Sequence, residues 1–348
     1  MIPHSRPTID EADILDVTSV LRSGNIAQGS VVEKFEQELA GYIGVKSGVA
    51  TSSGTAALHL ALIALDITRK DTVALPSYVC TAVLNAVNYV GASPLLIDTH
   101  PDTFNMDVED LKRKLTPQVK AVIVPHSFGL ASDLEEIIAL GIPVIEDCAQ
   151  SIGATYRNKL TGSFGNISIF SFYATKMITT GEGGMVVSDS EEFLRKIRDL
   201  RDYDNKENYG TRYNYKMTDF QAALGLSQLK KLNHFIEIRR KIAQRYNIEL
   251  KNLCSLPVNH GNDSKHIYYR YVINLRRDAE SFLKLSKEKG INCERPIFKP
   301  LHRYLNLSGF TNTDSVWEKA VSIPIYPTLT EKNMHIIIEF IKSAVTGL

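Results

Sequence analysis

The chain has 348 residues, a length that suggests about two domains and allows a large buried core. Its 40 lysine and arginine residues almost cancel its 39 aspartate and glutamate residues, which leaves a net charge of +1. This balance argues against a broad basic surface for nucleic acid or for an anionic membrane, so we expect neither partner.

The first two thirds of the chain alternate between helical and extended patterns. Apolar residues at Val32, Phe35, Leu39 and Tyr42 recur with a helical period and predict a helix over 32–42. Further helices are predicted over 56–65, 82–89 and 134–140, and strands over 48–51, 72–75, 94–97, 119–125 and 143–146. Such alternation predicts an α/β fold with a mostly parallel, doubly wound sheet, whose ligands lie at the carboxyl ends of the strands.

The pattern changes after about Leu226. A long amphipathic helix is predicted over 228–250, followed by a strand over 266–275 and helices over 279–289 and 331–344. We therefore expect a large domain with an N-terminal arm over residues 1–240 and a smaller α+β domain over residues 241–348.

The four cysteines, Cys80, Cys148, Cys254 and Cys293, form no closely spaced pair, which favours reduced thiols over disulfides or a zinc site. The N-terminus lacks the basic and apolar regions of a signal peptide. The uncharged run over 48–65 is too polar for a membrane helix. These features predict a cytoplasmic protein without a bound metal. Signature motifs of dinucleotide-binding folds, P-loops, zincins and α/β-hydrolases are absent from the sequence.

A first candidate motif is the run Thr51-Ser-Ser-Gly-Thr-Ala-Ala-Leu58, in which small hydroxyl residues follow a strand and open a helix. Free backbone N–H groups at a helix start, together with serine and threonine hydroxyls, can bind a phosphate group. The same pattern also suits an ordinary N-cap.

A second candidate motif is Glu146-Asp147, a carboxylate pair at the end of the predicted strand over 143–146. At this edge of an α/β sheet, Asp147 could bind a metal, a ribose or a protonated ring nitrogen, or it could cap a helix.

A third candidate motif places Lys176 between an apolar strand and the glycine-rich turn Gly181-Glu-Gly-Gly184. A neutral lysine amine in apolar surroundings is the group that forms Schiff bases, whereas most lysines are simply solvated. Taken together, a phosphate cradle, a strand-end aspartate and this lysine are what pyridoxal 5′-phosphate requires.

A series of short motifs in a fixed order runs through nearly the whole chain. They are Ser23–Gly29, Val32–Glu36, Ser53–Leu58, Glu146–Gln150, Ser171–Lys176, Gly181–Gly184, Tyr213–Met217, Gln221–Ala223, Gln228–Leu229 and Pro324–Pro327. Because it contains these motifs in this order, the chain resembles the DegT/DnrJ/StrS family of sugar aminotransferases. These are pyridoxal-phosphate enzymes of fold type I, in the aspartate aminotransferase superfamily.

The resemblance implies the catalytic residues. Lys176 would form the internal aldimine with pyridoxal 5′-phosphate and shuttle protons during the reaction. Asp147 would pair with the pyridinium nitrogen, and Gln150 would approach the ring oxygen of the cofactor.

The resemblance also implies the residues that hold the phosphate. Gly54, Thr55 and Ser171 would bind it within one subunit. Asn214 would reach it from the neighbouring subunit, so that the active unit is a homodimer with shared active sites.

Three positions differ from the family pattern or leave it open. Lys216 stands where the family usually has arginine, which removes the planar donor fork. Many members stack an aromatic ring on the cofactor, and here either Cys80 or Tyr78 could cover it. His126 lies at a strand end near the expected site, and we interpret it as structural.

The implied reaction is transfer of an amino group from L-glutamate to a keto-sugar, in most cases nucleotide-linked, by a ping-pong mechanism. The alternatives are a cyclitol or other free keto-polyol as acceptor, a sugar dehydratase, and a non-catalytic regulator on the same fold. Dehydratases of the deoxysugar type carry histidine at the position of Lys176, which argues against that alternative. Candidate contacts for a nucleotide diphosphate are Lys299, His302, Arg303 and Tyr326.

Overall fold

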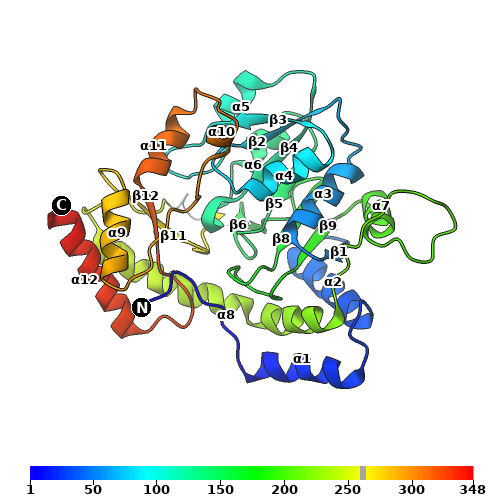
Figure 1. Cartoon of the computed structure of the whole chain (residues 1–348), viewed down its shortest axis with the longest axis horizontal. Helices are drawn as coiled ribbons and strands as arrows, with labels where there is room; N and C mark the ends of the chain where they lie inside the picture. Colours follow the sequence, from blue (N-terminus) through cyan, green and yellow to red (C-terminus); the bar gives the residue numbers. More distant parts are fainter. Residues whose placement is uncertain (259–263, 348) are drawn as a thin grey trace.

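The structure, a computed structural model, describes residues 1–258 and 264–347 (Figure 1). A seven-stranded sheet forms its centre, with the strand order β1-β9-β8-β5-β4-β2-β3. These strands are β1 (Ser47–Thr51), β2 (Thr72–Pro76), β3 (Ser93–Ile97), β4 (Val119–Pro125), β5 (Val144–Asp147), β8 (Ile167–Ser171) and β9 (Gly184–Ser188). The five strands predicted from the sequence match β1 to β5 to within one residue at either end.

The predicted mostly parallel α/β fold is confirmed, since every neighbouring pair from β3 through β8 is parallel. Strand β9 is the exception, because it runs antiparallel to both β8 and β1. The loop between β8 and β9 contains no helix, and a parallel return normally requires a helical crossover. This loop carries Lys176.

Helices cover both faces of the sheet, because alternate strand residues point to opposite sides. Ile123, Ile145 and Val186 belong to the core on one face, while Val122, Val144 and Met185 belong to the cores on the other. The helices of this large unit are α1 (Glu11–Ser23), α2 (Ser30–Ile43), α3 (Gly54–Ala64), α4 (Thr81–Tyr89), α5 (Val108–Lys114), α6 (Leu134–Ile138), the 3-10 helix η1 (Ser127–Gly129) and α7 (Glu191–Arg201).

The long helix α8 (Asp219–Leu250) passes beneath the sheet and continues into the smaller unit, with α1 alongside it (Figure 1). It begins nine residues before its predicted start because Thr218 and Gln221 form a capping box. Its residues up to Ile236 pack into the core around α2, and those from Ile242 onward pack into the core of the smaller unit. From this change of packing partner we propose a domain division at residues 240/241.

The smaller unit is built on the antiparallel pair of β11 (Tyr271–Asn274) and β12 (Ala320–Ile323). Around this pair lie α9 (Glu280–Glu288), α11 (Thr311–Lys319) and α12 (Glu331–Gly347), whereas α10 (Leu301–Tyr304) packs against the large unit through Leu301. A separate small sheet joins β10 (Ser264–Lys265) to β6 (Thr155–Tyr156) and β7 (Lys159–Leu160).

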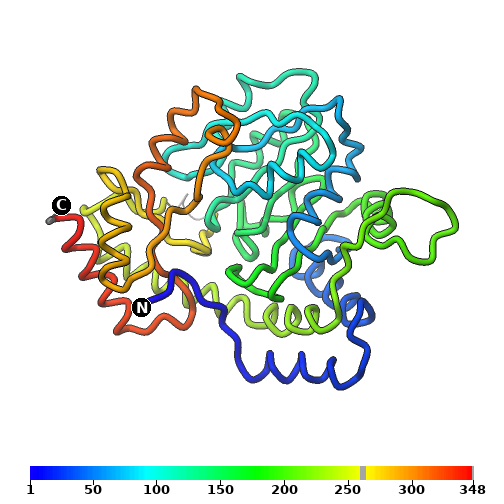
Figure 2. The backbone as a smooth tube through the Cα atoms, in the orientation of Figure 1, coloured from blue at the N-terminus to red at the C-terminus, as the bar shows by residue number. Residues whose placement is uncertain are grey.

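Two features of the smaller unit differ from the sequence-based expectation. The strand predicted over 266–275 is interrupted, because Tyr268 has a φ of 51° in the left-handed region and extended pairing begins only at Tyr271. The start of the N-terminal arm lies beside this unit, where Ile2 pairs with Ile291 and joins its core (Figure 2). Among the described residues, no helix is both long and apolar enough to cross a membrane.

Candidate active site

The start of α3 forms a cradle of the kind that binds phosphate. Ser53 is the extended N-cap residue, and its hydroxyl accepts a hydrogen bond from the N–H of Ala56 at 3.1 Å. The first N–H groups of a helix have no partner within the helix, so those of Gly54 and Thr55 remain available to an anion. The sequence motif is therefore both an N-cap and an open helix start.

Ser171, the last residue of β8, lies directly against this helix start. A Cβ atom at Gly54 would stand 2.8 Å from the Ser171 Cβ and 3.2 Å from its hydroxyl oxygen. On the next strand, a Cβ atom at Gly184 would stand 2.6 Å from the Gly54 nitrogen. Glycine is required at both positions because backbone and hydroxyl groups converge there, as the predicted phosphate cradle demands.

Asp147 ends β5 at the carboxyl edge of the sheet and is 7% exposed. One of its carboxylate oxygens accepts a hydrogen bond from the N–H of Ala149 at 3.0 Å. Burial raises the pKa of Asp147, while this hydrogen bond and the charge of Lys176 act in the opposite direction. A buried carboxylate of this kind suits a cationic partner such as a protonated ring nitrogen.

Lys176 lies in the loop between β8 and β9, where its backbone N–H donates to the backbone carbonyl of Tyr173. Its ammonium nitrogen lies 5.1 Å from the ring centre of Tyr269, which comes from the segment before β11. The Tyr269 hydroxyl is 3.2 Å from the Thr175 hydroxyl. Burial would raise the pKa of Tyr269, but the charges of Lys176 and Arg270 outweigh it and lower the pKa to about 8.

Tyr269 is a site residue that the sequence analysis did not identify. It is only 6% exposed and lies 93 positions from Lys176 in the chain. The sequence predicts a strand over 266–275 that includes Tyr268, Tyr269 and Tyr271, and no local pattern marks one of these rings as a partner of the lysine.

Gln150 and Cys80 also lie at this edge of the sheet. Gln150 uses its carbonyl oxygen to accept a hydrogen bond from the N–H of Phe128 at 3.0 Å, which orients its amide nitrogen. Phe128 is held at a φ of 58°. Cys80 is exposed, but partial burial by the surrounding protein raises the pKa of its thiol. The charge of Lys176 lowers this pKa, and the charge of Asp147 raises it.

Tyr78, the other candidate for the cofactor face, is 2% exposed and packs against Phe104 and Phe128. Its ring is enclosed by this aromatic cluster, whereas Cys80 is exposed.

His126 is fully buried with both ring nitrogens engaged. Nδ1 accepts from the N–H of Ser132 at 3.1 Å, so Nε2 carries the proton and donates to Glu146 at 3.0 Å. Glu146 also accepts from the N–H groups of Gly162, Phe164 and Gly165. These contacts support a structural role for His126. Cys148 lies close enough to form a possible metal-binding group with them, but both His126 nitrogens and both Glu146 oxygens already make hydrogen bonds within the protein.

Asn214 and Lys216 lie in the segment before α8. The Asn214 side chain is exposed, and the neighbouring carbonyl of Tyr215 accepts from the N–H of Ser52 at 2.7 Å, beside the phosphate cradle. Lys216 bridges two separate carboxylates, Asp202 at 2.8 Å and Asp204 at 3.1 Å.

The four candidate nucleotide contacts differ in exposure. His302 is 2% exposed and lies 2.7 Å from the Ser77 hydroxyl, and Tyr326 is 3% exposed. Both therefore belong to the interior. Arg303 and Lys299 line an open groove beside α9.

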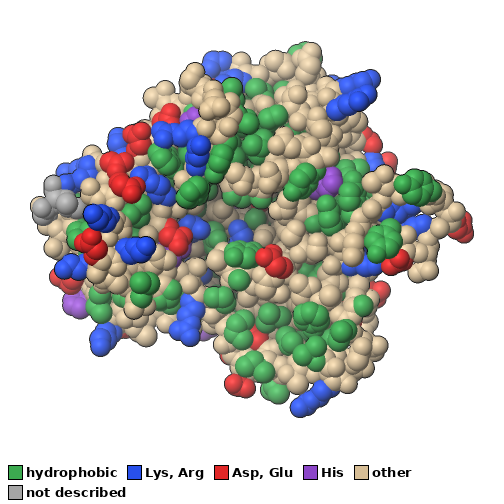
Figure 3. All heavy atoms as spheres, viewed as in Figure 1, with side chains coloured by type: hydrophobic (Ala, Val, Ile, Leu, Met, Phe, Trp, Pro, Cys, Tyr) green, Lys and Arg blue, Asp and Glu red, His purple; other side chains and the backbone are tan. Residues whose placement is uncertain are grey.

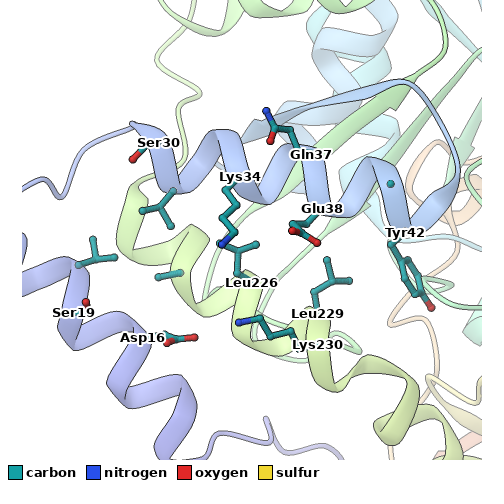
Figure 4. Close-up of a pocket in the computed structure, with 14 residues that line it drawn as sticks. Asp16, Ser19, Ser30, Lys34, Gln37, Glu38, Tyr42, Leu226, Leu229 and Lys230 are labelled. Atoms are coloured by element: carbon teal, nitrogen blue, oxygen red, sulfur yellow. The ribbon is translucent and has the colours of Figure 1, made fainter.

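A cavity of about 1050 Å³ also opens between α1, α2 and α8 (Figure 4). Lys34 and Glu38 of α2 face Leu226 and Lys230 of α8 across it. None of the predicted site residues lines this cavity, and its mixed charges indicate no particular ligand.

The lysine, the buried aspartate and the helix-start cradle thus meet at one edge of a mostly parallel sheet. This combination suits pyridoxal 5′-phosphate, and the comparison with known proteins identifies a pyridoxal-phosphate-dependent transaminase of fold type I. The DegT/DnrJ/EryC1/StrS aminotransferase family matches residues 7–342, and the chain belongs to this family.

Relatives and solved structures cover almost the full chain. The GDP-perosamine synthase of Escherichia coli O157:H7 is 35% identical over 98% of this chain and 97% of its own. The spore coat polysaccharide biosynthesis protein SpsC of Bacillus subtilis is 33% identical over 99% and 97%. The pyridoxal-phosphate form of the putative sugar aminotransferase Spr1654 of Streptococcus pneumoniae superposes with a TM-score of 0.94 at 26% identity, covering 99% of both chains.

Proposed function

We propose that this transaminase transfers the amino group of L-glutamate to a nucleotide-linked keto-sugar by a ping-pong mechanism. Its family consists of aminotransferases, and several relatives are named GDP-perosamine synthases, which favours a nucleotide-linked acceptor. The observation that carries the proposal is the convergence of Lys176, Asp147 and the start of α3 at the carboxyl edge of the sheet.

The cofactor supplies an electron sink when it is bound. In the proposed site, the N–H groups of Gly54 and Thr55 and the Ser171 hydroxyl hold its phosphate. Asp147 keeps its ring nitrogen protonated, and the oriented amide of Gln150 donates to its ring oxygen.

Lys176 is the proposed catalytic residue. Its amine would carry the 1,3 proton shift between the substrate carbon and the cofactor, in opposite directions in the two half-reactions. Cys80 lies beside the ring face. We infer that the thiol occupies the place where many family members have an aromatic ring.

We also propose a homodimer in which Asn214 completes the phosphate site of the neighbouring subunit. The exposed Asn214 side chain beside its own cradle is compatible with a reach across an interface. Light scattering should give the mass of two chains. Asn214→Ala should weaken cofactor binding without changing the mass.

The deciding experiment compares the cofactor-loaded protein with Lys176→Ala. The unaltered protein should convert one equivalent of L-glutamate to 2-oxoglutarate, and borohydride reduction should leave the cofactor mass on the peptide that contains Lys176. The variant should lose both properties while keeping its circular dichroism spectrum. Full turnover by the variant would refute the assignment. A panel of nucleotide keto-sugars, keto-inositols and keto-acids then identifies the acceptor.

A further inference from the structure

The amine of Lys176 lies against an aromatic ring and not against a carboxylate. Figure 3 shows that lysine and arginine side chains over the part of the molecule that holds α9 and α11 are interspersed with acidic ones. Lys176 differs from them, because it is half-buried and no carboxylate of the described residues forms an ion pair with it. Its nitrogen instead lies 5.1 Å from the ring centre of Tyr269, within the range of a cation–π contact.

Tyr269 packs apart from the tyrosines beside it. Tyr268 and Tyr271 belong to the core of the smaller unit, whereas Tyr269 belongs to the core around α2 in the large unit. The backbone changes direction at Tyr268, whose φ of 51° lies in the left-handed region that bulky residues rarely adopt. Such a conformation is unfavourable and persists only where the surrounding structure enforces it, most often at functional sites. Here it directs one ring out of the smaller unit and toward Lys176.

Hydrogen bonds from two sides hold this backbone in place. Arg239 of α8 donates to the carbonyls of Tyr268 and Tyr269, both at 3.2 Å. On the other side, the N–H groups of Ile267 and Arg270 donate to backbone carbonyls of η1 at 3.1 Å and 3.3 Å. The segment is therefore bonded to α8 and to η1 on either side of Tyr269.

The ring of Tyr269 is also fixed at its far end. Its hydroxyl lies 3.2 Å from that of Thr175, the residue directly before Lys176. A ring held through both its backbone and its hydroxyl has little freedom to rotate. The lysine side chain, by contrast, has a long flexible stem that can take many conformations. The ring therefore provides a fixed surface for a flexible side chain.

We propose that Tyr269 is a positioning residue for Lys176: its ring face holds the amine at the carboxyl edge of the sheet whenever the amine is not bonded to the cofactor. The inference rests on the proposed function, which makes Lys176 the group that bonds to the cofactor. A ring suits this task better than a carboxylate. It attracts the cation without the strong hydrogen bond that a carboxylate would accept, so the amine stays free to lose its proton and react. Holding the amine in one place raises the rate of the bond-forming step.

The test measures how fast pyridoxal phosphate bonds to Lys176 in protein prepared without cofactor, with no amino donor or acceptor present. In this step the amine replaces the aldehyde oxygen, which leaves as water. Absorbance follows the rate, and borohydride reduction with mass spectrometry locates the product on the Lys176 peptide. Tyr269→Leu should bond the cofactor about tenfold more slowly, because an aliphatic side chain offers no ring face. Tyr269→Phe keeps the ring and should remain within about threefold of the unaltered protein.

Tyr271→Phe is the matched control for Tyr269→Phe. It removes a buried tyrosine hydroxyl from the same part of the chain, but this hydroxyl bonds to Asn247 at 2.6 Å and not to the site. It should bond the cofactor at the unaltered rate. Urea unfolding of each variant establishes that the proteins compared are folded. Tyr269→Met, whose side chain adapts more readily to the space, takes the place of Tyr269→Leu if that variant does not fold.

Recovery of the rate by phenylalanine distinguishes positioning from a structural role. The proposal is wrong if the folded variant without the ring bonds the cofactor as fast as the unaltered protein. It is also wrong if Tyr269→Phe and Tyr269→Leu are slowed equally, because the hydroxyl and not the ring would then be responsible. With L-glutamate, Tyr269→Leu should lower kcat and leave KM nearly unchanged, because the ring contacts Lys176 and not the donor. A rise in KM alone would assign Tyr269 to the donor and overturn the proposal.

The unaltered protein separates this proposal from the proposed function. If it bonds the cofactor at Lys176 but does not react with L-glutamate, the donor assignment is refuted and the role of Tyr269 stands. If it does not bond the cofactor at Lys176, the proposed function is refuted, and the role of Tyr269 with it.

Discussion

At the scale of single residues, the site depends on close approaches that only particular side chains permit. Gly54 and Ser171 come from a helix start and a strand end, and they meet with no room for an extra carbon. Tyr269 and Lys176 meet across two parts of the fold. Both pairs lead to predictions that need no knowledge of the substrate.

Gly54→Ala should weaken cofactor binding and lower the free energy of unfolding by about 1–3 kcal/mol, because the new Cβ would lie 2.8 Å from the Ser171 Cβ. Urea unfolding and titration with pyridoxal phosphate measure the two effects. Gly41→Ala is the control. It also substitutes a glycine within a helix, α2, but meets no atom within 4 Å, and it should stabilise the protein by roughly 0.5–1 kcal/mol. Equal behaviour of the two variants would contradict the close approach.

In the protein without cofactor, the Tyr269 hydroxyl should lose its proton at a lower pH than an ordinary tyrosine. Its pKa of about 8 lies below the ordinary value of 10.0, so the folded state favours the phenolate. Folding should therefore gain stability from this group as pH rises from about 8 to 10, and lose that contribution as pH falls back. Ultraviolet titration should show one phenolate step near pH 8 that Tyr269→Phe removes. Identical titrations of the two proteins below pH 10 would refute the assignment.

At the scale of elements, α8 holds the segment that delivers Tyr269. Arg239 is 3% exposed on α8 and donates to the carbonyls of Tyr268 and Tyr269 at 3.2 Å and of Ile325 at 2.9 Å. Burial lowers the pKa of Arg239 to about 10. Three carbonyls from two segments thus converge on one side chain.

Arg239→Met should lower the free energy of unfolding by roughly 2–4 kcal/mol, since it leaves buried carbonyls without donors. It should also return the pKa of Tyr269 toward its ordinary value, because it releases the backbone that positions the ring. Lys241→Met is the control, because Lys241 is exposed on the same helix. Denaturant unfolding measures the free energy of unfolding of both variants. If Arg239→Met lowers it no more than Lys241→Met does, the arginine does not hold the segment.

At the scale of the whole molecule, folding keeps two histidines neutral, one in the smaller unit and one in the N-terminal arm that packs on it. Burial, with a smaller effect of Arg240, lowers the pKa of His266 to about 3, and burial with Arg270 and Arg239 lowers that of His4 to about 3. The unfolded chain binds protons at both sites below 6.5, whereas the folded chain does not. Stability should therefore fall as pH drops from 6.5 toward 3.

Within this pH window, each histidine should lower the free energy of unfolding by about 1.4 kcal/mol per pH unit. His266→Asn should reduce the slope, because asparagine can still accept the hydrogen bond that Nδ1 takes from the N–H of Tyr268 but cannot gain a proton. Urea unfolding at about pH 7 and about pH 5 measures the slope. An unchanged slope in the variant would mean that His266 is protonated in the folded state.

The sequence by itself determined the α/β class and strands β1 to β5, and it supplied the candidate residues that we propose carry the chemistry. These features are written in short windows: alternating apolar runs, a hydroxyl-rich helix start, an acid at a strand end and a lysine before a glycine-rich turn. Their order along the chain was sufficient to indicate pyridoxal phosphate, the cofactor of the family.

The tertiary structure decided what depends on distant segments meeting. Only the folded chain shows that β9 runs antiparallel, that the N-terminal arm packs on the smaller unit and that Tyr78 is enclosed while Cys80 lies near Lys176 and Asp147. The contact between Tyr269 and Lys176 belongs to the same group. Periodicity reports which face of an element is buried, but it does not report which other element covers that face, because that choice is made by packing across the whole molecule.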